Sequence, residues 1–178
     1  IQLDTPGGLD SSMRDIIKRI LASKVPVALY VSPQGARAAS AGVFIAMASN
    51  IVAMSPGTNI GAAHPVMIAS LPSLTKDKDK EKDKDSKQKD PMEEKVLNDA
   101  SAYMKSIAEK SGRNGEWAIK AVAKSDSISA EEAVKTGVAD FLAADMNEFL
   151  AKLDGRELAG FGKLRLSGPK VETLVQTR

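Results

Sequence analysis

The chain has 178 residues, 43% of them hydrophobic and 27% charged, which is typical of one compact domain. Its 25 basic and 23 acidic side chains leave a formal net charge of +2, so no excess of positive charge is available to bind nucleic acid. The lack of cysteine excludes disulfides, thiolate metal sites and a cysteine nucleophile, and a single histidine argues against a histidine-based metal cluster. No apolar run approaches the roughly 20 residues of a membrane-spanning helix, so we expect this piece to be soluble.

Strands and helices are predicted to alternate through the first third of the chain. Residues 1–4 read as the end of a buried strand, and a TPGG turn and an amphipathic helix over 9–23 follow. Further along, the pattern predicts a strand over 26–31, a buried helix over 41–49 and short strands over 50–56 and 58–63. This alternation predicts an α/β fold with a mostly parallel sheet and flanking helices. Because the chain starts inside a predicted strand, we expect it to be a fragment of a longer protein.

The second half opens with a run of alternating charges over 76–90, which has no apolar residue to bury and predicts a disordered loop. A long helix over 93–112 ends at a glycine, and Ser129 with Glu132 has capping-box spacing at the start of another helix. In the rest of the chain the pattern predicts a helix over 117–124, a strand over 138–143 and a helix over 146–153. A C-terminal hairpin extension is predicted over 155–178, built from KLRLSG and VETLVQ. We expect one domain over 1–178.

Ser40 is the first candidate for chemistry, because it lies between small residues, in ARAASAGVFIA, where a loop turns into an apolar helix. The simplest interpretation is an N-cap serine. The alternative is a nucleophile whose small neighbours let a substrate backbone approach. In that case the N–H of Ala41 and the N–H of Gly8, in the glycine turn after the first strand, would be available to a developing oxyanion. That arrangement suits acyl transfer.

A serine nucleophile needs a base, and the sequence offers few. His64 is the single histidine, and a lone histidine is more often structural than catalytic. A lysine serves as a base when burial disfavours its charged form. Lys95 begins an apolar helix immediately after the charged loop, although its periodicity is also compatible with a surface lysine.

Several separated motifs match a known family in order: IQLDTPGG, PVALYV, ARAASAG, MSPGTNIGAAHPV and SISAEEAVKTGVAD. Over about residues 1–150 the chain resembles the protease domain of the NfeD family, membrane-bound serine proteases of the Clp protease/crotonase fold class. The resemblance implies a Clp protease/crotonase-like fold.

The resemblance also implies a Ser-Lys dyad, with Ser40 as the nucleophile, Lys95 as the base and the N–H groups of Gly8 and Ala41 as the oxyanion hole. The implied activity is an endopeptidase that needs neither ATP nor a cofactor and cleaves hydrophobic segments of stomatin-like proteins. The parent protein is implied to be anchored in a membrane with this domain outside the cytoplasm, and we expect a homo-oligomer, a dimer. No metal site is expected.

Three alternatives stay open. A Clp-type triad would pair Ser40 with His64 and Asp126, which lie near the histidine and aspartate positions of Clp proteases. A crotonase-like acyl-CoA enzyme would use similar backbone donors, but it has no need of a serine and would want a nucleotide cradle that the sequence lacks. A module without catalytic activity would keep the fold and dock a stomatin-like partner.

Overall fold

The computed structural model describes residues 1–66 and 91–174, and the predicted charged loop over 76–90 lies outside these ranges. The helices are α1 (Asp10–Leu21), α2 (Ala41–Ala48), α3 (Pro91–Ser111), α4 (Gly115–Lys124), α5 (Ala130–Lys135) and α6 (Met146–Leu153). The strands are β1 (Gln2–Leu3), β2 (Ala28–Val31), β3 (Arg37–Ala39), β4 (Ile51–Met54), β5 (Asn59–Gly61), β6 (Ser127–Ser129), β7 (Phe141–Leu142), β8 (Glu157–Leu158) and β9 (Gly162–Lys163). Within the described ranges, no helix combines the length and the apolar character needed to cross a bilayer.

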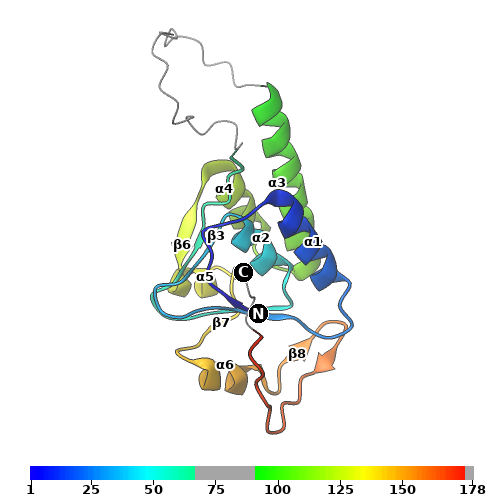
Figure 1. Cartoon of the computed structure of the whole chain (residues 1–178), viewed down its shortest axis with the longest axis vertical. Helices are drawn as coiled ribbons and strands as arrows, with labels where there is room; N and C mark the ends of the chain where they lie inside the picture. The colour runs from blue at the N-terminus through cyan, green and yellow to red at the C-terminus, as the bar shows by residue number, and fades with distance from the viewer. Residues whose placement is uncertain (67–90, 175–178) are drawn as a thin grey trace.

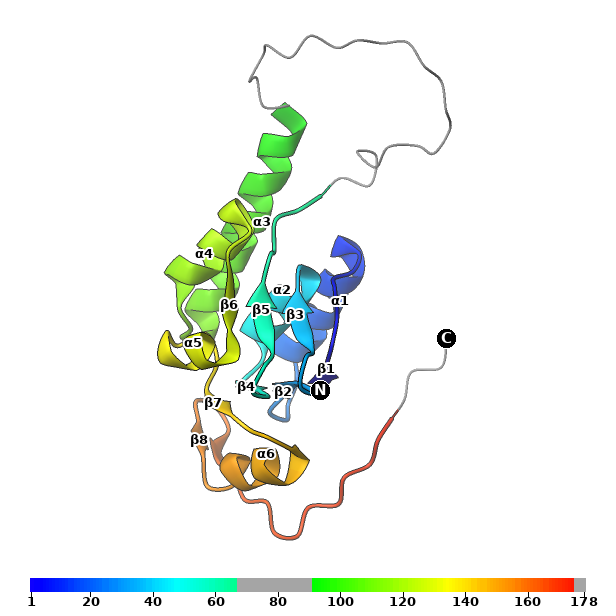
Figure 2. The same ribbon diagram turned by 90° about the vertical axis from the view of Figure 1, so that its left-hand side faces the viewer.

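The strands form two main sheets. One has the order β1-β2-β4-β7 and is parallel throughout, which confirms the prediction of a parallel α/β core. The other has the order β3-β5-β6, with β3 parallel and β6 antiparallel to β5. Figure 2 shows these three strands side by side, with α2 behind them. Strand β5 lies within the strand predicted over 58–63, whereas β3 and β6 were not predicted.

Helix α2 is the centre of the structure, and all eight of its residues are buried. Helices α1 and α3 both pack against it (Figure 1). Alternate residues of the parallel sheet face this main core, while Tyr30 and Phe141 face the other way, toward α6. There the ring of Tyr30 stacks on Phe149, with ring centroids 4.8 Å apart. The helix that follows Ser40 is therefore held on every side.

The end of the chain differs in detail from the prediction. A hairpin is present, but its strands are β8 and β9 rather than KLRLSG and VETLVQ. Residues 164–174 form no strand. Leu164 and Leu166 instead pack against the small core under α6. Their alternating apolar pattern thus reflects packing onto α6 and not a strand pairing.

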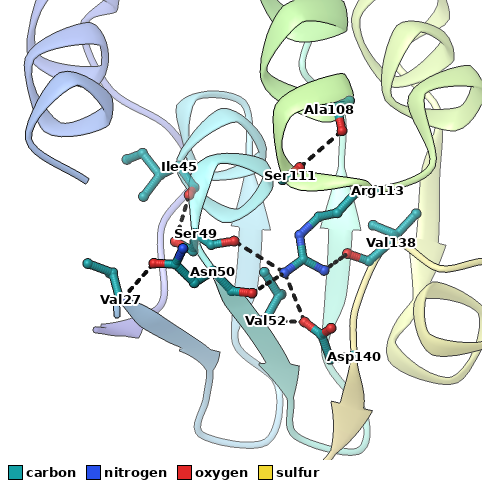
Figure 3. A network of polar contacts seen from close by, with 10 residues as sticks. All are labelled: Val27, Ile45, Ser49, Asn50, Val52, Ala108, Ser111, Arg113, Val138 and Asp140. Carbon is teal, nitrogen blue, oxygen red and sulfur yellow. Dashed lines mark hydrogen bonds and ion pairs between the residues drawn. The ribbon is translucent and has the colours of Figure 1, made fainter. Parts of the chain in front are cut away.

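A buried arginine joins α3, β4 and β7 (Figure 3). The side chain of Arg113 is only 5% exposed and makes an ion pair of 2.9 Å with Asp140. Its guanidinium also donates to the carbonyl oxygens of Ser49 and Asn50. The same Asp140 oxygen accepts from the N–H of Val52, at 2.7 Å. The end of α2, the start of β4 and the approach to β7 therefore meet at one side chain.

We expect Arg113→Met to lower the free energy of unfolding by about 3 kcal/mol, because the Asp140 carboxylate loses its cation and the carbonyls of Ser49, Asn50 and Val138 lose a donor. Urea unfolding of the variant beside the wild type measures the loss. Lys18→Met is the control: Lys18 pairs with Asp15 at the surface, where both side chains are more than 70% exposed, and such pairs contribute about 0–1 kcal/mol. Equal losses in the two variants would contradict this account.

Candidate active site

Ser40 lies at the junction of β3 and α2 in an unusual backbone conformation. Its φ of 53° and ψ of −115° lie outside the regions that residues other than glycine normally occupy, a strain of about 1–3 kcal/mol. It occupies the N-cap position of α2, but its hydroxyl makes no cap hydrogen bond. Ser40 is therefore at the N-cap position, as the simplest interpretation of the sequence predicted, but its side chain does not cap the helix. A strained strand-to-helix turn that presents a serine hydroxyl is typical of nucleophilic serines.

The glycine turn after β1 is held directly against Ser40. Thr5 pairs with β3, donating its N–H to Arg37 and accepting from Ala39. Gly7 has φ +139°, and a Cβ there would lie 2.9 Å from Ser40 Cβ and 3.2 Å from its Oγ. The site therefore requires a glycine at position 7. The sequence analysis did not single out Gly7, although its place in TPGG was a usable signal.

Two backbone donors lie beside this hydroxyl. Ala41 is the first residue of α2, so its N–H has no partner within the helix. Neither this N–H nor that of Gly8 donates to any described residue. The two residues are neighbours, since a Cβ on Gly8 would lie 3.9 Å from that of Ala41. Two such N–H groups beside a hydroxyl, one at the N-terminus of α2 and one in the glycine turn, form an arrangement that can stabilise an oxyanion.

A cavity of about 430 Å³ opens at this point, and Ser40, Gly8, Ala41 and Lys95 all line it. The lysine comes from the second turn of α3, 55 positions after the serine, and is exposed within the described structure. Apolar side chains form much of the remaining wall: Met13, Phe44, Pro65, Val66 and Val96. The structure thus brings the residues of the predicted dyad and oxyanion hole to one cavity.

The residues of the alternative triad are placed differently. His64 lies between two residues of the cavity wall, but its Nδ1 is 3.0 Å from the carbonyl oxygen of Val122. Because a carbonyl can only accept, Nδ1 carries the proton in this contact. Asp126 lines a separate hollow, and its carboxylate accepts from the N–H of Ser127. Among the described residues, no hydrogen bond or ion pair joins these two side chains, and neither residue lines the cavity.

Three charged residues of the cavity wall were missed by the sequence analysis. Asp10 and Arg14 come from α1 and Asp99 from α3, and Arg14 forms ion pairs with both aspartates. The pair between Arg14 and Asp99 joins residues 85 positions apart, and no local pattern in the sequence indicates it. Within the described ranges, no group of three or more histidine, aspartate or glutamate side chains is placed to hold a metal ion.

The parallel sheet, the second sheet beside it and the flanking helices form the Clp protease/crotonase fold. ClpP1 from Listeria monocytogenes shares this fold, with a TM-score of 0.56 and 18% identity over 83% of this chain and 74% of its own. The family model described as NfeD1b, N-terminal domain, matches residues 1–159. The chain belongs to this family, which confirms the resemblance and the fold class inferred from the motifs.

A curated relative, the membrane-bound protease PH1510 of Pyrococcus horikoshii, is 43% identical over 155 residues, 87% of this chain. The chain spans about a third of that relative's length. Two solved structures named 1510-N membrane-bound stomatin-specific protease are each 37% identical over 99% of this chain. One is a serine-to-alanine mutant, with a TM-score of 0.82 and 81% of its chain covered. The other is a lysine-to-alanine mutant in complex with a substrate peptide, with a TM-score of 0.80 and 77% covered.

Proposed function

We propose that this chain is the catalytic domain of a serine endopeptidase, with Ser40 as the nucleophile, Lys95 as the general base and the N–H groups of Gly8 and Ala41 as the oxyanion hole. One observation carries the proposal: a strained serine without a cap bond, a lysine and two free backbone donors all line the same cavity. The solved relatives named as proteases, with their serine and lysine mutants, support it.

The chemistry would follow in two halves. The neutral amine of Lys95 takes the proton of the Ser40 hydroxyl while Oγ forms a bond to the peptide carbonyl carbon. The carbonyl oxygen becomes an oxyanion that accepts hydrogen bonds from Gly8 and Ala41. The C–N bond then breaks, and the lysine returns the proton to the leaving amine. In the second half, a water molecule gives a proton to Lys95 and attacks the acyl-enzyme carbonyl. The ester C–O bond then breaks, Lys95 returns that proton to Ser40 Oγ, and the carboxylic acid leaves.

Lys95 is exposed in the described structure, so the loss of water that favours its neutral form must come from elsewhere. A peptide lying in the cavity would supply it, since it would cover the lysine and bring it against the apolar wall of Phe44 and Val96. The base would then become effective when the substrate is bound.

The apolar wall also supports the proposed substrate class. A cavity with these side chains favours apolar residues on either side of the scissile bond. The solved relatives are named stomatin-specific. We therefore propose that the substrates of this chain are hydrophobic segments of stomatin-like proteins, which it cleaves without ATP. The relative PH1510 is named membrane-bound, and we propose that the parent of this chain is membrane-anchored, with this domain outside the cytoplasm and acting as a dimer.

A fluorophosphonate probe, which acylates activated serines, tests the proposal. We expect the wild type to be labelled at Ser40, as located by peptide mass mapping, and to cleave a fluorogenic apolar peptide. The exposure of Lys95 favours one competing function, a docking module without catalytic activity. Absence of both labelling and cleavage in a folded protein would support that module and overturn the protease.

A further inference from the structure

The cavity wall carries a chain of charges that the proposed mechanism does not use. The Nε of Arg14 is 2.8 Å from an oxygen of Asp10, and its Nη2 is 2.5 Å from an oxygen of Asp99. The guanidinium also lies over the ring of Tyr103, 4.3 Å from the ring centroid. The arginine side chain is 28% exposed and both aspartates are 68% exposed. These contacts hold Arg14 in one place, between α1 and α3.

Asp99 follows Lys95 by four positions on α3, so the two side chains lie on the same helix face, one turn apart. A lysine and an aspartate at this spacing can form an ion pair with each other. In the described structure they do not: Asp99 pairs with Arg14, and no ion pair of Lys95 is present. The carboxylate one turn beyond the lysine, on the same face of α3, is therefore already paired with another cation.

We propose that Arg14 is a positioning residue for the proteolytic reaction: by pairing with Asp99 it keeps that carboxylate from pairing with Lys95, and so leaves the lysine free to approach Ser40. This inference rests on the proposed function. Without Arg14, Asp99 would draw the lysine back along α3 and stabilise its protonated form, which cannot act as a base. The arginine would thus act on the reaction without touching the substrate.

The other charges around the cavity agree with this role. From α1, Asp10 and Arg14 line the wall, and from α2 only the neutral groups of Ser40, Ala41 and Phe44 do so. From the segment 63–66 only Ala63, Pro65 and Val66 line the wall, and His64 does not. On α3, Glu93 and Glu94 precede Lys95. Burial lowers the pKa of the Arg14 guanidinium, but the hydrogen bonds and charges of Asp10 and Asp99 outweigh it and raise that pKa. Arg14 therefore stays charged across the working pH range.

The test measures the rate of fluorophosphonate acylation of Ser40, and kcat/KM on a fluorogenic apolar peptide, as functions of pH. In Arg14→Met we expect the inflection to move to higher pH by about 0.5–1 unit, a three- to tenfold loss on the rising limb, since a nearby unpaired carboxylate favours the protonated lysine. In Asp99→Asn we expect a shift of the opposite sign. The double variant should return close to the wild-type inflection, because it lacks both charges.

A purely structural role predicts another pattern, in which both single variants lose activity with an unmoved inflection and the double variant is not rescued. That result would overturn the inference. If Arg14→Met is unfolded at the assay temperature, Asp99→Asn alone is the test: a shift of its inflection to lower pH supports the role of Arg14, and no shift or a shift to higher pH overturns it. Lys105→Met is the control. It removes a cation from α3 at roughly 15 Å along the helix, beyond the screening length, and should leave the profile unchanged.

A Lys95→Ala variant separates this inference from the proposed function. Wild-type activity in Lys95→Ala would overturn the proposed function itself. An inactive Lys95→Ala together with coincident profiles for Arg14→Met, Asp99→Asn and wild type would overturn only the role of Arg14.

Discussion

Ser40→Ala is expected to reduce cleavage of a fluorogenic apolar peptide by at least about 10³-fold while the protein stays as stable as the wild type. Loss of the nucleophile removes the covalent step. Stability should be preserved because the Ser40 hydroxyl makes no cap hydrogen bond, and alanine meets the same backbone strain at φ 53° as serine does. Steady-state kinetics and thermal unfolding, on the same preparation, measure the two effects.

Ser129→Ala is a matched control for this prediction. Ser129 is also an N-cap, but its Oγ accepts a hydrogen bond from the N–H of Glu132, at 3.2 Å, as the capping-box spacing predicted. Removing that bond should cost about 0.5–2 kcal/mol of stability and leave cleavage unchanged. If Ser40→Ala instead behaved like Ser129→Ala, less stable and still active, Ser40 would be a structural cap and not a nucleophile.

Lys95→Ala should be about as damaging as Ser40→Ala, whereas His64→Ala should be mild. The lysine shares the cavity with the serine, while the imidazole of His64 contacts the Val122 carbonyl outside it. Lys95→Arg is an informative second variant, because arginine keeps the positive charge but does not give up its proton. It should also be inactive if the lysine acts as a base. Activity in Lys95→Arg would indicate a role for the charge alone.

The pH dependence of kcat/KM distinguishes the two bases further, since this ratio reports ionisations of the free enzyme. A lysine base must lose its proton first, so the rate should rise through neutral into alkaline pH. A histidine base with an ordinary pKa of about 6.5 would already be neutral there and give a plateau. An inflection near 6.5 that disappears in His64→Ala would replace the dyad with the Clp-type triad.

Local patterns were sufficient for most elements of the fold. The apolar spacing of α1 and α3 and the alternation of strand and helix predicted the parallel sheet, because helix and strand periods are properties of neighbouring residues. The capping box at Ser129 was read correctly for the same reason. In the second sheet only β5 was predicted, within 58–63, and its pairing with β3 and β6 was not. The strands of this sheet have three residues each, and what defines them is their pairing with one another.

The candidate site also combines features that local sequence predicts with features that depend on the tertiary structure. The sequence by itself determined that Ser40 begins a buried helix among small residues and that Gly8 lies in a turn after the first strand, since both are local features. Only the tertiary structure brought Lys95 and Arg14 to the cavity of Ser40. It also decided that Gly7 must lack a side chain, that Asp99 pairs with Arg14, and that His64 is directed to Val122. These relations join residues 33 to 85 positions apart in the chain. They arise because segments distant in sequence pack together, α1 with α3 and the segment after β5 with α4, and no short stretch of sequence encodes that packing.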